Sequence, residues 1–62
     1  MVKKLRIKRG MTQQELADRS GIHISAVQKL EAGQATIENT RLQNALAIAD
    51  ALGVPVEKLI KH

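Results

Sequence analysis

The chain has 62 residues with no cysteine and no aromatic side chain, so we expect one small domain with an aliphatic core, no disulfides and no thiolate metal site. No apolar run approaches the ~18 residues of a membrane span and no signal peptide is visible, which predicts a cytoplasmic protein. Ten Lys and Arg against six Asp and Glu give a net charge of +4, which suits a polyanion, either nucleic acid or an anionic membrane surface, unless it serves only solubility.

The first predicted helix covers residues 2–9, in which Val2 and Leu5 have the spacing of a core-facing pair. This segment contains five cations and no acid, namely Lys3, Lys4, Arg6, Lys8 and Arg9. Diffuse attraction to a polyanion and simple solvation of the helix explain this charge equally well.

The second predicted helix has the clearest start in the sequence. Thr12 is a good N-cap, and Glu15 follows three residues later, as in a capping box. Met11 and Leu16 have the spacing of a hydrophobic staple across the same boundary. The sequence therefore predicts a helix that begins directly after Thr12.

The third predicted helix runs from about Ile24 to Ala32. Ile22 and Val27 repeat the staple spacing before it, although His23 is a weaker cap than Ser or Asp. Residues 34–39, with the sequence QATIEN, are predicted to form a loop.

A fourth helix is predicted from about Thr40 to Leu52, with apolar residues at helical spacing: Leu42, Leu46, Ala49 and Leu52. Pro55 suits the first turn of a short fifth helix carrying Val56, Leu59 and Ile60. No strand alternation is present. The predicted fold is therefore all-α, with five helices in a single domain of residues 1–62.

The second and third helices are separated by a very short turn. In TQQELADRSGIHISAVQKLEAG, residues 12–33, Ala17 is small where the two helices would approach each other, and Gly21 permits a sharp turn. Val27 and Leu30 would anchor the third helix from behind. These constraints describe a helix-turn-helix, whose second helix is directed outward toward a DNA major groove.

The chain resembles the phage repressor/Cro-type (XRE) helix-turn-helix family. LRIKRGMTQQELA resembles the first helix of the family and the start of the second, SGIHISAVQKLEAG the turn and recognition helix, and ALGVPVEKLI the final helix. The resemblance extends from Val2 to Ile60. It implies a compact repressor-like domain that binds double-stranded DNA, as a homodimer on a palindromic operator. Two features depart from the family: a longer loop after the third helix, and Ile24 where a polar residue is frequent.

The resemblance places four residues of the third helix at base-contacting positions: Ile24, Ser25, Gln28 and Lys29. Lys29 could donate to guanine N7 and O6, and Ile24 could pack on a thymine methyl. Two alternatives remain open, because Ile24 could instead fold back onto the second helix or a partner subunit, and Lys29 could hold a phosphate without reading a base.

The resemblance also places Gln13 on a DNA phosphate, and a helix N-terminus is suited to an anion. The full set of candidate phosphate contacts is Thr12, Gln13, His23, Asn39 and Arg41. For His23 the competing role is to cap the third helix. In family members an Arg and a Glu at the positions of Arg6 and Glu31 form a buried pair, which implies a structural ion pair here.

Three classes of function follow. The first is a sequence-specific DNA-binding regulator, most simply a repressor, that needs no cofactor. The alternative is a protein-interaction module, such as an antitoxin or adaptor, that uses the longer loop or the apolar end of the chain: Val54, Val56, Leu59 and Ile60. An enzyme is not expected, because no nucleophile–base pair, carboxylate pair or metal-ligand cluster is present in the sequence.

Overall fold

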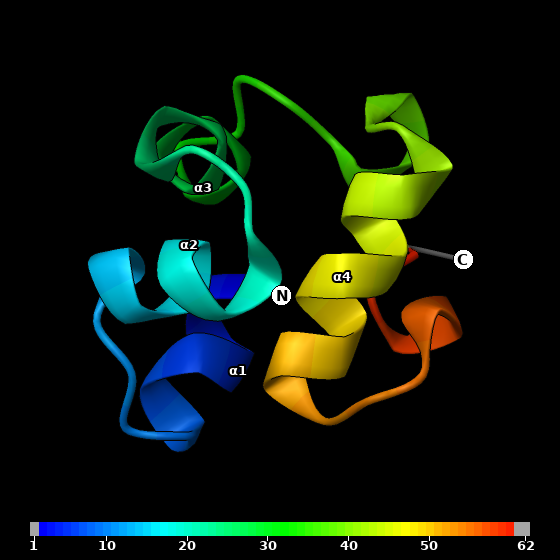
Figure 1. The fold of residues 1–62 in the computed structure, drawn as a ribbon. Coiled ribbons are helices and arrows are strands. Elements are labelled where there is room, and N and C mark those ends of the chain that lie inside the picture. Colours follow the sequence, from blue (N-terminus) through cyan, green and yellow to red (C-terminus); the bar gives the residue numbers. More distant parts are fainter. Residues whose placement is uncertain (1, 61–62) are drawn as a thin grey trace.

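The computed structural model describes residues 2–60, and Met1, Lys61 and His62, at the ends of the predicted domain, lie outside them. Residues 2–60 contain no strand. Their helical elements are α1 (Val2–Lys8), α2 (Gln13–Ser20), α3 (Ile24–Glu31), the 3₁₀ turn η1 (Ile37–Asn39), α4 (Leu42–Leu52) and the 3₁₀ turn η2 (Val56–Lys58). Figure 1 shows α3 at the upper left and α4 on the right. The predicted all-α class is confirmed, but the described chain has four α-helices and not five.

The start of α2 and the turn after it follow the local sequence signals. The Glu15 N–H donates to Thr12 Oγ1 at 3.1 Å, and the Thr12 N–H donates to Glu15 Oε1 at 3.0 Å, so the predicted capping box is present. Gly21 ends the helix with a φ of 73°. Because a Cβ strains this left-handed conformation, glycine permits the abrupt turn into α3.

The predicted fifth helix is only the 3₁₀ turn Val56–Lys58. Pro55 precedes this turn in an extended conformation, with ψ 148°, and is not its first helical residue. The Lys58 N–H and the Leu59 N–H donate to carbonyls three residues back. A segment this short can form very few of the hydrogen bonds that link residues four apart in an α-helix. Short helical pieces therefore commonly have the three-residue hydrogen bonds of a 3₁₀ helix.

The connection between α3 and α4 is more ordered than the predicted loop. It contains η1, whose Ile37 is buried in the core. The Thr40 hydroxyl donates to the Thr36 carbonyl at 2.7 Å, and Thr40 and Arg41 both have extended ψ angles, 147° and 137°. The fourth helix therefore begins at Leu42, two residues later than predicted.

The core is aliphatic and centres on α2. Its four fully buried side chains are Leu16, Val27, Ile48 and Leu52. α2 packs against both α3 and α4, and a hollow of about 160 Å³ lies between those two helices. Leu42 and Leu46, which share the helical spacing of the core residues of α4, are 70% and 48% exposed and lie outside the core.

Candidate nucleic-acid interface

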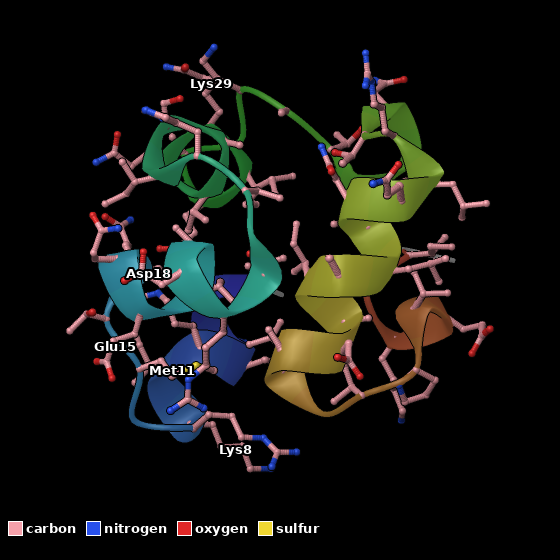
Figure 2. The ribbon with its side chains drawn as sticks, viewed as in Figure 1. Lys8, Met11, Glu15, Asp18 and Lys29 are labelled. Carbon is pink, nitrogen blue, oxygen red and sulfur yellow. The ribbon has the colours of Figure 1, made fainter. Side chains whose placement is uncertain are left out.

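One face of α3 presents polar side chains to solvent. Ser25, Gln28 and Lys29 are all exposed and are spaced three and four residues apart, so they share a face. The opposite face contains Val27, which is fully buried, and Leu30, which packs against the core. Figure 2 shows Lys29 extending from the top of the molecule, away from the other helices.

Ile24 differs from the three polar residues of α3. Its side chain is half-buried and packs against the core. This packing matches the alternative in which Ile24 folds back onto the protein. The freely accessible members of the predicted base-contacting set are therefore Ser25, Gln28 and Lys29.

His23 and Ser25 form a local cap at the start of α3. The Ser25 N–H donates to His23 Nδ1 at 3.1 Å, and Ser25 Oγ lies 2.8 Å from the same ring nitrogen. This arrangement satisfies one of the backbone donors that a helix leaves free at its N-terminus. His23 thus caps α3, which was the competing role for this residue, while its ring remains exposed.

The N-terminus of α2 retains two backbone donors. The capping box satisfies the N–H groups of Thr12 and Glu15, and Leu16 donates to the Thr12 carbonyl. The N–H groups of Gln13 and Gln14 lie in the first turn, where helical geometry provides no acceptor. They can receive an anion, which the helix dipole also favours.

Gln13 also belongs to a network that joins three helices. Its Nε2 donates to Glu31 Oε1 at 3.0 Å. Arg6 donates to the same carboxylate through two nitrogens, Nε to Oε2 at 2.6 Å and Nη2 to Oε1 at 3.0 Å. A third Arg6 nitrogen, Nη1, donates to the Met11 carbonyl at 2.8 Å. The side chains of Arg6 and Glu31 are 12% and 5% exposed.

The network shifts the pKa of both charged partners. Partial burial alone raises the pKa of Glu31, but hydrogen bonds from Arg6 and Gln13, together with the Arg6 charge, outweigh burial and hold it below the ordinary value of 4.5. The hydrogen bond from Arg6 to Glu31 raises the pKa of Arg6 above its ordinary value. Both groups are therefore charged at neutral pH, and the end of α3 is fixed to α1 and to the start of α2.

Asn39 and Arg41 lie in the connection that precedes α4, and both are exposed. The Asn39 N–H donates to Thr36 Oγ1 at 3.2 Å, so its backbone is already engaged in η1. Arg41 occupies the N-cap position of α4 without a side-chain capping bond. The hollow between α3 and α4 is lined by Lys29 on one side and Asn44 on the other. Lys29 and the start of α4 thus border one surface feature.

The cations of the N-terminal segment are spread over different parts of the molecule, and Lys3 lies near enough to Glu31 for its charge to lower the pKa of that carboxyl. Arg6 is held by Glu31. The Arg9 guanidinium lies beside Gly53 at the end of α4, where a Cβ would be 3.2 Å from Arg9 Nη2. Figure 2 shows Lys8 at the bottom of the molecule and Lys29 at the top. The basic N-terminal segment is therefore not a single DNA-facing patch.

The hydrogen bond between Gln13 and Glu31 could not be found from the sequence. The two residues are 18 positions apart, and their contact depends on how α2 and α3 cross. Arg6 and Gln13 both donate to the Glu31 carboxylate, and this arrangement is apparent only from the packed helices.

No group of three or more His, Cys, Asp or Glu side chains suited to a metal ion is found within residues 2–60. In the same part of the chain, no helix is long and apolar enough to cross a membrane.

The short turn, the buried side of α3 and its exposed polar side define a helix-turn-helix domain. A family model described as helix-turn-helix matches residues 2–59. The chain therefore belongs to the phage repressor/Cro-type (XRE) helix-turn-helix family, whose members are DNA-binding regulators. No curated protein and no solved structure gives a significant match.

Proposed function

We propose that the chain binds duplex DNA sequence-specifically and acts as a transcriptional repressor, with α3 in the major groove. The observation that carries this proposal is the exposed polar face of Ser25, Gln28 and Lys29 on a helix whose other face is anchored in the core. Base-edge recognition needs polar groups held in a fixed direction, and α3 provides them without involvement of a cofactor.

Each residue of this face has chemistry suited to a base edge. Lys29 donates to guanine O6 and N7, and Gln28 pairs with adenine N6 and N7. The Ser25 hydroxyl lies 2.8 Å from His23 Nδ1. When this hydroxyl donates its hydrogen bond to His23, the Ser25 oxygen can still accept a hydrogen bond from an adenine or cytosine amino group. Ile24, being half-buried, contributes only its accessible edge to a thymine methyl.

Phosphate contacts position α3 and carry little sequence information. The N–H groups of Gln13 and Gln14 receive one phosphate at the start of α2, and the Gln13 amide, held by Glu31, directs its second hydrogen to the same group. Asn39 and Arg41 contact phosphates of the DNA strand that passes beside the start of α4. Thr12 and His23 act mainly through their caps, and the exposed His23 ring adds a phosphate contact.

The protein acts in pairs on a palindromic site. Groove-reading helices of this class bind half-sites one helical turn apart, about 34 Å centre to centre, so a dimer reads both halves of a palindrome. The dimer forms at least on DNA, and the protein acts in the cytoplasm.

Selection of bound duplexes from a random pool tests the proposal. We expect an enriched palindrome. Lys29→Ala should relax the preference at one symmetric pair of positions, by about 1–3 kcal/mol of discrimination. Gln13→Ala should weaken all sequences by a similar factor and leave the preferred site unchanged. Recovery of no enriched sequence would contradict sequence-specific binding. Equal weakening of every site by Lys29→Ala would contradict the assignment of Lys29 as a base reader.

A protein-interaction module is the second candidate, favoured by the exposed leucines of α4, Leu42 and Leu46. The apolar end of the chain, one of the two surfaces that the sequence suggested for this role beside the longer loop, is less available, because Leu59 is buried and Val54, Val56 and Ile60 pack against the core. DNA binding should weaken steeply as salt is raised, whereas a contact through these leucines should not.

A further inference from the structure

The hollow between α3 and α4 is larger than the voids that ordinary packing leaves. Both helices pack on α2 but have few direct contacts with each other, and Figure 1 shows their connection, residues 32–41 in green, spanning the space between them. Voids larger than a water molecule are few in protein interiors, whereas this hollow has a volume of about 160 Å³. An apolar cavity of about 150 Å³ holds a molecule of the size of benzene. The hollow therefore has room for a small organic ligand.

The floor of the hollow is apolar. Ile22 and Ala26 line it from the turn and from α3, together with Leu30, and Ala35 lines it from the connection. Ile48 of α4 also lines it and is itself fully buried, so the hollow extends to the core. Water on such a floor finds few hydrogen-bond partners, and an apolar group that displaces this water gains affinity.

The rim of the hollow has one positive charge. Lys29 lines the hollow and is exposed, and the described residues that line it include no Asp or Glu. Within residues 2–60, no carboxylate forms a salt bridge with Lys29. The flexible four-carbon stem of a lysine lets its ammonium reach an anion at the mouth. The rim therefore favours a ligand with a negative charge.

Asn44 adds a hydrogen-bond donor on the other side of the hollow. It belongs to α4 and lines the hollow opposite Lys29, and its amide offers two hydrogens. The Thr40 hydroxyl also lines the hollow, but it already donates to the Thr36 carbonyl at 2.7 Å. One ammonium and one amide match a carboxylate, whereas a phosphate group carries about two negative charges and would leave one of them without a cation.

We propose that the hollow binds a small monocarboxylate with an apolar body of about six carbon atoms, such as benzoate, and that the bound carboxylate withdraws Lys29 from DNA. The body fills the hollow above Ile48, and the carboxylate accepts from the Lys29 ammonium and the Asn44 amide. The competition with DNA rests on the proposed function, because it needs Lys29 in contact with DNA, but ligand binding can be measured without DNA. Since ligand and DNA use the same ammonium, each lowers the affinity for the other.

Titration of the ¹⁵N-labelled natural chain with benzoate, followed by NMR of the backbone amides, tests the ligand site. We expect shifts centred on Ala26, Ala35 and Asn44. Benzamide, which lacks the charge, and acetate, which lacks the apolar body, should each bind at least about tenfold more weakly. Lys29→Gln should bind benzoate no better than the natural chain binds benzamide. Absence of shifts around the hollow, or equal binding of benzoate and benzamide, would overturn the proposed site.

A variant that fills the hollow locates the ligand. Ala35→Leu adds bulk inside it and keeps the backbone bond from the Ala35 N–H to the Lys29 carbonyl. Ala32→Leu is the matched control, because Ala32 is exposed and lies outside the lining. Ala35→Leu should abolish benzoate binding and Ala32→Leu should not. If Ala35→Leu does not fold, Asn44→Ala replaces it and should weaken binding by about threefold. Benzoate binding equal to that of Ala32→Leu in the variant used would overturn the site.

The competition with DNA is measured on the selected duplex. Acetate at the same concentration is the control, because it matches the ionic strength on which DNA binding depends. Saturating benzoate should lower the affinity of the natural chain at least about fivefold, the lower limit for a lost base contact, and should leave that of Lys29→Gln unchanged. Benzoate binding without a change in DNA affinity would overturn the competition for Lys29. A natural chain that binds benzoate but no DNA would contradict only the proposed function.

Discussion

Arg6 connects three parts of the fold through one guanidinium group. It binds the Glu31 carboxylate at the end of α3 and the Met11 carbonyl just before α2. The planar fork of an arginine suits such a bidentate contact, and lysine cannot reproduce it. The orientation of α3 therefore depends on the Arg6 side chain, even though Arg6 lies away from the exposed face of α3.

Removal of Arg6 should destabilise the protein. Breaking a buried pair costs roughly 3–5 kcal/mol, and the residual exposure of the two side chains, 12% and 5%, places Arg6→Ala near or just below the lower end of that range. The Arg6→Ala/Glu31→Ala double variant should lose clearly less than the sum of the single losses. Urea denaturation followed by far-UV circular dichroism measures this, since the chain lacks Trp and Tyr. Additive losses would mean that the pair contributes nothing.

Acid should weaken the same network. The pKa of Glu31 is lower in the folded protein than its ordinary value of 4.5, so the folded state binds a proton less readily than the unfolded state. The stabilising contribution is complete above about pH 4.5 and is lost as pH falls through the lower folded pKa.

Denaturation of the natural chain and of Glu31→Gln between pH 3 and 7 checks this contribution. The glutamine variant should be less stable at pH 7 and should lose less stability on acidification. Glu15, whose pKa the Thr12 N–H also lowers, adds an acid dependence that both proteins share. Parallel pH curves for the two proteins would show that Glu31 does not contribute.

The contacts of some site residues could be predicted from the sequence, whereas those of others could not. The ion pair of Arg6 with Glu31 followed from the family resemblance, and its geometry is now given by the structure. The half-burial of Ile24 and the bond from Gln13 to Glu31 depend on the angle at which α2 and α3 pack. Local sequence signals contain no information on that angle.

Among the helices, α2 has the most clearly defined N-terminus, and its cap should be measurable. Thr12→Ala removes the acceptor for the Glu15 N–H and should cost about 1 kcal/mol, as is typical for a lost N-cap. Thr12→Ser keeps the hydroxyl and is the matched control, expected to be close to the natural chain. Equal stability of the alanine and serine variants in urea denaturation would contradict a role for the capping bond.

Helix boundaries were predictable where a local bond defines them and not where tertiary packing does. The capping box of α2 consists of residues three apart, so its sequence signature suffices. In α4, several apolar stripes have helical spacing, and packing on α2 selected the one with Ala45, Ile48 and Leu52. Leu42 and Leu46 were left outside the core for this reason.

Across the whole molecule, the distribution of cations matters more to DNA binding than the net charge of +4. Lys8 and Lys29 are both exposed, but they lie at opposite ends of the structure (Figure 2). Interactions between exposed charges fall off over about 8–10 Å at physiological salt, a distance shorter than the smallest molecular dimension of 19 Å. If DNA binds against α3 as proposed, salt screens it from Lys8, whereas Lys29 reaches it directly.

This placement predicts different salt dependences for two variants with the same change in charge. Lys29→Gln should reduce the slope of log affinity against log salt by about one per subunit, whether Lys29 holds a phosphate or a guanine, because the cation displaces a counterion. Lys8→Gln should leave that slope nearly unchanged. Titrations of the selected duplex at several salt concentrations, from about 50 to 200 mM, provide the comparison. If Lys8→Gln lowered the slope as much as Lys29→Gln, the DNA would have to contact the α1 end of the molecule, and α3 could not be the sole recognition element.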